Sequence, residues 1–323
     1  MAGKRVVVTE PIDPSGIELL KKETDVVYLP ELPGRKLADE IAQAQALVVR
    51  VMKIDRSLIE EGEKLLVIAK HGVGYDNIDV DTATKRKIVV VNTPAANAES
   101  VIEHNIGFMI ALSKKICSVD RALRTGTFKN RELFTGVEMD GKKLGIIGLG
   151  RIGSGIAEKC KCAFNMDVVV YDPYATKEKV RQAGFNKADK LDDLLSEVDY
   201  VVICVPFTGE TANLIGAKQL DMMRKTSFLI NSSRGGIVDE AALYDYLVRG
   251  KIAGAAMDVF KEEPPSARNP LLSLDNFIAT PHTAGVTEES MKRIAATLAD
   301  DVLRVLRGER PQFPVNPQVY ARY

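Results

Sequence analysis

A glycine-rich segment at residues 145–157, GIIGLGRIGSGIA, constrains the fold more than any other part of the chain. The apolar residues before the glycines predict a buried strand over 144–147, and those after them predict the start of a helix. Gly148, Gly150 and Gly153 have the G-x-G-x-x-G spacing of a dinucleotide-binding turn. In such a turn the backbone approaches a pyrophosphate, and the N-terminus of the following helix favours its negative charge. The segment therefore predicts a βαβ unit that binds a dinucleotide.

An acidic residue follows the next predicted strand, over 167–171. Asp172 stands where the fingerprint places a carboxylate for the ribose hydroxyls. Because a carboxylate repels the 2′-phosphate of NADP, we expect the cofactor to be NAD. An ordinary strand–turn–helix unit without a ligand is the alternative interpretation of the glycines alone.

Short β-branched runs alternate with helical segments along the chain. This alternation predicts the α/β class, with parallel sheets covered by helices on both faces. Further strands are expected at 5–9, 25–29, 46–51, 65–70, 88–92, 199–205, 227–231, 253–258 and 277–280. Helices are expected at 15–22, 37–45, 101–112, 239–249 and 287–307.

The fingerprint lies near residue 148 rather than near the N-terminus. A cofactor domain inserted into another domain explains this position economically. We therefore expect a Rossmann domain over residues 100–285. The second domain, built from residues 1–99 and 286–323, would be a doubly wound, flavodoxin-like substrate domain.

The composition excludes several functional classes. Lys plus Arg and Asp plus Glu number 44 each, so no overall field attracts nucleic acid or an acidic membrane. No apolar run reaches bilayer-spanning length, and the N-terminal MAGKRVVVTE lacks the apolar core of a signal peptide. Four cysteines suit a reducing cytoplasm. Cys160 and Cys162 have no nearby His or Cys partners, so we expect no metal.

Three later segments carry residues suited to acid–base and carboxylate chemistry. Arg234, in INSSRGGIVDE, follows a predicted strand and precedes two glycines. Its planar fork can grip a carboxylate and an adjacent carbonyl oxygen together. Glu263 lies five residues after Asp258, which ends a strand. His282, in TPHTAG, is one of three histidines and a candidate for proton transfer near neutral pH.

Over nearly its whole length the chain resembles the D-isomer-specific 2-hydroxyacid dehydrogenases, especially the phosphoglycerate dehydrogenase branch. The motifs that carry the resemblance are HGVGYDNIDV, VNTP, SVIEH, GKKLGIIGLGRIG, VVYDPY, NSSRGGIVDE, GAAMDVFKEEPP and TPHTAG. The resemblance implies the two-domain arrangement described above, a homodimer, and hydride transfer between a nicotinamide and C2 of a 2-keto or 2-hydroxy acid.

The resemblance also implies catalytic roles. Arg234 would bind the substrate carboxylate and the C2 oxygen. His282 would donate a proton to that oxygen during reduction and accept it during oxidation. Glu263 would orient the imidazole and stabilise its cationic form. The backbone N–H groups of Val73 and Gly74 would help to hold the carboxylate.

Cofactor contacts are implied in the same way. Arg151 and Ile152 would present backbone amides to the pyrophosphate, and Asp172 would bind the adenine ribose. The remaining contacts would come from Val205 and Thr211 on the adenosine side and from Asp258 at the carboxamide. For Val205, simple strand packing is an additional interpretation.

The identity of the hydroxy acid depends on the cations available. Arg50, Lys53 and Lys70 lie at expected strand ends and loops, and Asn97 adds a hydrogen-bonding group. They favour 3-phosphoglycerate as the substrate. The phosphoglycerate branch often has arginine at the position of Lys70, and lysine lacks its bidentate fork. Because the sequence ends at Tyr323, we expect no serine feedback through a C-terminal domain.

Two alternatives remain open. Hydroxypyruvate or glyoxylate reduction is the nearest within the enzyme class. An NAD-sensing transcriptional corepressor, which binds partner peptides, belongs to a different class and can retain the same three catalytic residues. Of the other histidines, His71 is either a substrate contact or a surface residue, and His104 is expected to be structural.

Overall fold

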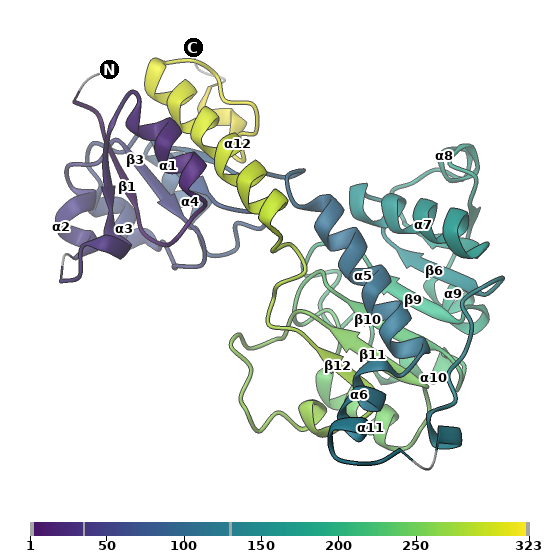
Figure 1. The fold of residues 1–323 in the computed structure, drawn as a ribbon. Helices are drawn as coiled ribbons and strands as arrows, with labels where there is room; N and C mark the ends of the chain where they lie inside the picture. Colours follow the sequence, from purple (N-terminus) through teal and green to yellow (C-terminus); the bar gives the residue numbers. More distant parts are fainter. Residues whose placement is uncertain (1–2, 35, 129–130, 321–323) are drawn as a thin grey trace. The chain divides into compact units, whose positions relative to one another are not determined.

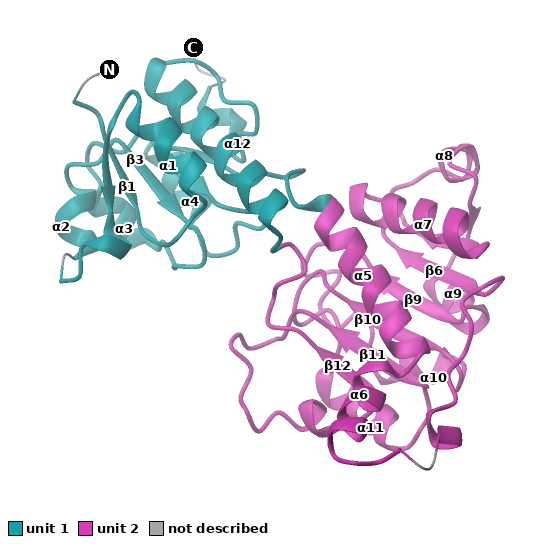
Figure 2. Ribbon diagram, viewed as in Figure 1, with its two compact units in different colours: residues 1–98, 286–323 teal, residues 99–285 magenta. Residues whose placement is uncertain are grey.

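The computed structural model describes residues 3–34, 36–128 and 131–320. The chain separates into two compact units, shown in different colours in Figure 2. Unit 1 contains Met1–Ala98 and Val286–Tyr323, and unit 2 contains Glu99–Gly285. Each unit has its own parallel sheet, and each is described by itself below.

Unit 1 is built on a five-stranded sheet in the order β2-β1-β3-β4-β5, with every neighbouring pair parallel. This is the flavodoxin-like strand order. The strands are β1 (Arg5–Val8), β2 (Asp25–Tyr28), β3 (Ala46–Val49), β4 (Val67–Lys70) and β5 (Val89–Val91). The α-helices are α1 (Pro14–Lys21), α2 (Leu37–Ile41), α3 (Arg56–Glu61), α4 (Val80–Lys85) and α12 (Glu288–Arg307), with 3-10 turns η1 (Leu29–Glu31) and η4 (Pro317–Val319).

Alternate side chains of these strands enter two different cores. Val6 and Val8 pack on the face covered by α1 and α12, whereas Val7 packs on the opposite face with residues of α2, α3 and α4. This follows from the two-residue period of a strand, and burial on both faces explains why the strands are continuously apolar.

The C-terminal helix α12 completes the first of these cores. Its buried residues Ile294, Leu298 and Val302 form an apolar stripe at helical spacing on the helix predicted over 287–307. The helix lies beside α1 (Figure 1), and a Cβ at Gly16 would lie 2.8 Å from the Cβ of Ala295. The two helices therefore approach closely, and residues after 286 are part of the N-terminal unit.

Unit 2 contains a seven-stranded parallel sheet in the order β12-β11-β10-β9-β6-β7-β8. Its strands are β6 (Lys143–Ile147), β7 (Asp167–Tyr171), β8 (Asn186–Lys187), β9 (Tyr200–Ile203), β10 (Phe228–Asn231), β11 (Gly254–Met257) and β12 (Phe277–Ala279). Its helices are α5 (Ala98–Ser113), α6 (Ile116–Arg124), α7 (Arg151–Phe164), α8 (Lys177–Gln182), α9 (Leu191–Glu197), α10 (Ala217–Met222) and α11 (Glu240–Val248), with 3-10 turns η2 (Arg131–Phe134) and η3 (Pro270–Ser273). The chain runs from β6 outward to β7 and β8, then returns to β9 on the other side, as in a Rossmann fold.

The two faces of this sheet are again covered by different helices. Ile146 packs with residues of α5 and α7, and Ile147 packs with residues of α9, α10 and α11. The strand order reverses between β6 and β9, and ligands of doubly wound sheets bind at the carboxyl ends of the strands at such a point.

The predicted fold class, two doubly wound parallel sheets with helices, is confirmed. Element boundaries were less accurate, since the helix expected over 37–45 ends at Ile41, and β8 was not predicted. β8 has two residues, too few to produce a recognisable pattern. Among the described helices, none is sufficiently long and apolar to cross a bilayer.

Candidate active site

The glycine-rich turn connects β6 to α7 at the point where the strand order reverses. Gly148 has φ +96°, and a Cβ there would lie 2.7 Å from the carbonyl oxygen of Cys204. A Cβ at Gly153 would lie 2.1 Å from the carbonyl oxygen of Gly148. Both positions therefore require glycine, the first for backbone conformation and the second for close packing of helix on strand.

The start of α7 has the properties of a pyrophosphate site. Gly150 is the N-cap residue and supplies no side-chain cap, and a Cβ placed there would meet no atom within 4 Å. The N–H groups of Arg151 and Ile152 belong to the first turn, where a helix offers no acceptor of its own. Open space beside such N–H groups at a helix N-terminus suits a phosphate. The residues present therefore fit a dinucleotide.

Asp172 lies after β7 and is bound to the glycine-rich turn. Its Oδ2 accepts the N–H of Leu149 at 2.8 Å, and its Oδ1 accepts the N–H groups of Tyr174 at 2.8 Å and Ala175 at 3.2 Å. The carboxylate thus holds the turn in place, and Oδ2, which accepts one N–H group, retains capacity for a ribose hydroxyl.

Val205 and Thr211 lie in the loop after β9. Val205 packs over the glycine turn, because its Cγ1 lies 2.7 Å from the Cβ position of Gly148. The Thr211 hydroxyl donates to the carbonyl of Pro206 at 2.7 Å and accepts the N–H of Thr208 at 2.7 Å. Both side chains therefore shape this loop, whatever contact they make with a cofactor.

Arg234 lies in a tight turn after β10. The turn is held by Asn231, whose side chain accepts the N–H of Ser233 at 3.0 Å and donates to the carbonyl of Arg234 at 3.0 Å. Gly235 packs so closely that a Cβ would lie 1.8 Å from the carbonyl oxygen of Phe260. This close approach brings the Arg234 turn against the loop that carries Glu263.

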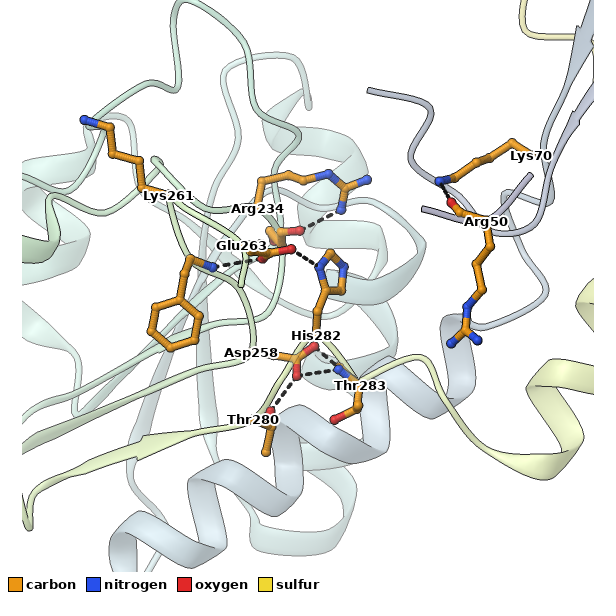
Figure 3. Close-up of polar contacts among 12 residues, drawn as sticks. Arg50, Lys70, Arg234, Asp258, Lys261, Glu263, Thr280, His282 and Thr283 are labelled. Atoms are coloured by element: carbon orange, nitrogen blue, oxygen red, sulfur yellow. Dashed lines mark hydrogen bonds and ion pairs between the residues drawn. The ribbon is translucent and has the colours of Figure 1, made fainter. Parts of the chain in front are cut away.

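His282 and Glu263 are hydrogen-bonded, with Nδ1 of His282 at 2.7 Å from Oε2 of Glu263. The Arg234 guanidinium donates to the carbonyl of Ser233 at 2.7 Å, and Figure 3 shows it above the imidazole, on the same side of the Glu263 carboxylate. The other carboxylate oxygen, Oε1, accepts the N–H of Phe260 at 3.0 Å. Both side chains remain partly exposed, 52% for His282 and 37% for Glu263, so a substrate can reach them.

The surroundings of Glu263 favour its ionised form. Burial raises the pKa of this carboxyl, but hydrogen bonds from His282 and from the Phe260 N–H, with the nearby His282 and Arg234 charges, outweigh it. The pKa of Glu263 therefore lies below its ordinary value. An ionised Glu263 requires a proton on Nδ1 of His282, which directs Nε2 toward other partners.

The turn that carries His282 is anchored on Asp258, a residue only 1% exposed at the end of β11. One carboxylate oxygen accepts the Thr280 hydroxyl and the N–H of Thr283 at 2.7 Å, and the other accepts the N–H of Ala284 at 2.8 Å. The carbonyl of Asp258 accepts the N–H of His282 at 2.8 Å. His282 itself has φ +55°, a left-handed conformation that costs about 1 kcal/mol for a residue with a Cβ.

In unit 1, the loop that follows β3 is held by a carboxylate. Glu10 accepts three successive backbone N–H groups through Oε2, from Arg50 at 2.7 Å, Val51 at 2.9 Å and Met52 at 3.1 Å. Successive N–H groups that converge in this way form an anion-binding nest. Burial raises the pKa of Glu10, but these bonds and one from Thr9 lower it further than burial raises it, so the net pKa is lowered.

Lys70 is directed into the same loop. The residue is 9% exposed, and its ammonium donates to the carbonyl of Arg50 and, at 2.8 Å, to Oδ1 of Asn77. Asn77 in turn donates to the carbonyl of Met52 at 2.6 Å. Figure 3 shows the Arg50 side chain extending away from this contact. Lys70 thus supports the loop, whereas Arg50 projects from it, and Lys53 in the same loop is exposed.

The other expected substrate contacts follow β4 and β5. Residues 72–74 are held by the β5 side, since Thr93 N–H donates to the carbonyl of Gly72 at 2.9 Å and Asn92 donates to that of Val73 at 2.6 Å. Val73 and Gly74 therefore lie in a restrained turn. Oδ1 of Asn97 is buried and has no hydrogen-bond partner among the described residues, as expected of a group that meets a ligand or water.

His71 is buried, with 5% exposure, so its interpretation as a surface residue is wrong. Burial lowers the pKa of His71 to about 4, and the charges of Arg50 and Lys70 act in the same direction. Its Nε2 has no hydrogen-bond partner among the described residues. His71 is thus a neutral imidazole at neutral pH.

Sequence reasoning missed Glu10 and Asn77 as supports of the loop after β3, and Thr280 as a support of the turn that carries His282. Glu10 is an acid directly after a buried strand, and Asn77 and Thr280 lie within the motifs that carried the family resemblance. These positions in the sequence could have pointed to the three residues. Their hydrogen-bond partners, however, lie in other segments of the chain and could not be read from the sequence. Within the described ranges, no group of three or more His, Cys, Asp or Glu residues is placed to hold a metal ion.

The fold and the site define a class of dinucleotide-binding protein with an Arg–Glu–His site, and comparison with known proteins identifies it further. The model of the D-isomer specific 2-hydroxyacid dehydrogenase NAD binding domain matches residues 106–284. A D-3-phosphoglycerate dehydrogenase of Methanocaldococcus jannaschii is 42% identical over 313 residues, which are 97% of this chain and 59% of that protein. A glyoxylate reductase of Korarchaeum cryptofilum is 36% identical, with 98% of this chain and 96% of that protein covered.

Solved structures give the same result. The D-lactate dehydrogenase of Aquifex aeolicus, complexed with NAD and lactic acid, has a TM-score of 0.82 at 30% identity and covers 95% of this chain and 96% of that one. The chain belongs to the D-isomer-specific 2-hydroxyacid dehydrogenase family. It contains the NAD-binding domain of that family, and it spans about 59% of the length of the phosphoglycerate dehydrogenase relative.

Proposed function

We propose that this protein is an NAD-dependent dehydrogenase that interconverts 2-keto and 2-hydroxy acids. The observation that carries the proposal is the hydrogen bond between His282 and Glu263, with the Arg234 guanidinium near enough for its charge to lower the pKa of Glu263. Arg234 would bind the substrate carboxylate and the C2 oxygen through its planar fork. When bound, NAD supplies the hydride chemistry at its nicotinamide.

His282 would move the proton. Its Nδ1 is bound to Glu263, so Nε2 is the atom that would donate a proton to the C2 oxygen in reduction and accept it in oxidation. Glu263 would balance the imidazolium charge. Arg234 would stabilise negative charge that develops on the oxygen. In this proposal the proton donor His282, the substrate-binding Arg234 and the orienting carboxylate of Glu263 act together.

The test is turnover of a 2-keto acid with NADH. His282→Ala should lower kcat by about 10²–10⁴-fold, the usual contribution of a positioned acid–base group. The dissociation constant for NADH, measured by fluorescence, should change less than twofold, because His282 is not part of the glycine-rich turn. Wild-type turnover in the variant would remove His282 from its proposed role. Absence of turnover in the wild-type protein with every 2-keto acid, together with NAD-dependent peptide binding, would favour the corepressor alternative.

We propose 3-phosphoglycerate and its keto acid as the preferred pair. Support comes from Arg50, which projects from a loop held by Glu10 and Lys70, and from the phosphoglycerate dehydrogenase relative. Hydroxypyruvate or glyoxylate is the second candidate. The ammonium of Lys70 donates to Arg50 and Asn77 of the protein itself, and a glyoxylate reductase is 36% identical to this chain. Comparison of kcat/KM for 3-phosphohydroxypyruvate, hydroxypyruvate and glyoxylate discriminates between them. A preference of about 100-fold for the phosphorylated acid would support the first assignment.

We further propose that the protein is a cytoplasmic homodimer. Support for the compartment is the presence of four free cysteines, Cys117, Cys160, Cys162 and Cys204. Support for the dimer comes from α6, which has no buried residue and carries Leu123, and from Phe128 and Leu133, which follow it in the sequence. These three apolar side chains are 57–67% exposed. Sedimentation equilibrium should show a dimer for the wild type and monomer for Leu123→Asp. A wild-type monomer would contradict the proposal.

A further inference from the structure

The strongest unexplained contact near the site joins α5 to the turn that carries His282. Nε2 of His104, on α5, lies 3.0 Å from the hydroxyl oxygen of Thr280. That hydroxyl donates to Oδ1 of Asp258. His104 is packed edge-on against Phe108, with ring centroids 4.4 Å apart. Neither His104 nor Thr280 is among the catalytic residues of the proposed function.

The protons of this chain of contacts can be assigned. A threonine hydroxyl has one hydrogen, and Thr280 uses it toward the carboxylate of Asp258. The Thr280 oxygen can then only accept from His104, so Nε2 of His104 carries a hydrogen. Burial lowers the pKa of His104 by more than the charge of Asp258 raises it, so the ring is neutral at neutral pH. The neutral ring is therefore the Nε2–H tautomer.

This chain of hydrogen bonds ends on the backbone of the catalytic turn. Asp258 receives Thr280 on the N-terminal side of His282 and the N–H groups of Thr283 and Ala284 on its C-terminal side. Between them, His282 is held at φ +55°. A residue with a Cβ stays in that conformation only where its surroundings constrain it, and such constraint is found at functional sites.

We propose that His104 is a positioning residue, which acts through Thr280 and Asp258 to hold the backbone of His282 in its left-handed conformation. The His104 hydrogen bond orients the Thr280 hydroxyl toward Asp258. This fixes the first of three donors that anchor the turn. His104 thereby directs the imidazole of His282 toward Glu263 without contact with substrate. The inference rests on the proposed function only for its kinetic consequence.

The kinetic test compares variants that remove or keep each hydrogen bond. Thr280→Val, which has nearly the same shape, should lower kcat about tenfold, whereas Thr280→Ser should keep at least half of the wild-type kcat. His104→Leu should also lower kcat, and His104→Gln, which keeps an N–H donor, should restore most of it. The KM for the keto acid and the dissociation constant for NADH should change less than twofold. The double variant His104→Leu/Thr280→Val should be no slower than Thr280→Val alone, because one residue acts through the other.

Several outcomes would overturn the proposal. The first is an unchanged kcat in Thr280→Val. The second is a double variant whose loss of kcat is the product of the two single losses. The third is a loss of kcat that follows the fall in Tm and is equal in Thr280→Ser and Thr280→Val. A readout without turnover separates this inference from the proposed function. Nitrogen-detected NMR of the histidine rings should show His104 as the Nε2–H tautomer, and Thr280→Val should shift the His282 signals. An Nδ1–H tautomer or unshifted His282 signals would contradict the proposal even in an active enzyme.

Discussion

Nδ1 of His282 lies 2.7 Å from Oε2 of Glu263, across 19 residues of sequence that contain β12 and its flanking loops. The pair is formed by two loops at the carboxyl ends of neighbouring strands β11 and β12. Its geometry leaves Nε2 as the ring atom available for proton transfer. Through this contact, two residues from different loops can act together as an acid–base pair.

The first prediction concerns that pair. Glu263→Gln should lower kcat at least tenfold, because a neutral amide does not balance the imidazolium charge. The neighbouring Glu262→Gln is the matched control and should retain wild-type kcat. Steady-state kinetics at saturating NADH measures both variants. Equal activity of the two would remove Glu263 from the proposed mechanism.

The pKa of Glu263 also sets the direction of a pH effect. Since its folded-state pKa lies below the ordinary value of 4.5, the carboxylate stays ionised as the pH falls through 4.5. The negative charge of Glu263 is lost only when the pH falls through the lowered folded-state pKa of this carboxyl. Loss of activity of the wild-type enzyme between pH 7 and 5 should therefore not arise from Glu263. The dependence of kcat on pH between pH 7 and 5 measures this, and a loss in that range that is traced to protonation of Glu263 would contradict the prediction.

A second prediction concerns the choice of cofactor. Asp172→Asn should reduce the preference for NADH over NADPH by about tenfold or more, because the charge that repels a 2′-phosphate is lost. Affinity for NADH should also fall, since Asp172 holds the Leu149 N–H of the glycine-rich turn. Asp167→Asn, at the opposite end of β7, is the control. Dissociation constants for both nucleotides give the result, and an unchanged ratio would contradict the role of Asp172.

The third prediction is a dependence of stability on pH caused by His71. Its folded-state pKa is about 4, below the unfolded value of 6.5, so the unfolded chain takes up a proton that the native protein does not. The associated stability is fully present above pH 6.5 and is lost as the pH falls from 6.5 to about 4. The loss amounts to about 3 kcal/mol. Urea denaturation of His71→Gln across this range should show a flatter pH profile than the wild type. Parallel profiles would show that His71 is not buried in its neutral form.

The fourth prediction concerns Glu10. Glu10→Gln removes the charge that receives three backbone N–H groups and should lower the free energy of unfolding by about 1–3 kcal/mol. Because Arg50 lies on the released loop, KM for a phosphorylated keto acid should rise more than KM for glyoxylate. Glu18→Gln, on the exposed side of α1, is the control for both measurements. An unchanged urea midpoint would show that the nest does not depend on the carboxylate.

Much of the fold could be predicted because its signals are local. Buried parallel strands need continuous apolar runs, and the tight turn of the fingerprint needs glycine at fixed spacing. Both requirements appear within a few residues of sequence. The same holds for the apolar stripe of α12, which repeats at the period of a helix. Short elements such as β8 left no such pattern.

The sequence by itself determined the kinds of group at the site. It supplied the glycine-rich turn, the acid after β7, and an arginine, a glutamate and a histidine next to strand ends.

The tertiary structure alone decided which of these groups meet. Lys70 was expected to face a phosphate, yet its ammonium is bound to Arg50 and Asn77. His71 could have been a surface residue and is buried. His104 is a helix residue whose partner, Thr280, is 176 positions away. Hydrogen bonds and burial depend on distances between segments that are remote in the chain, and only folding brings those segments together.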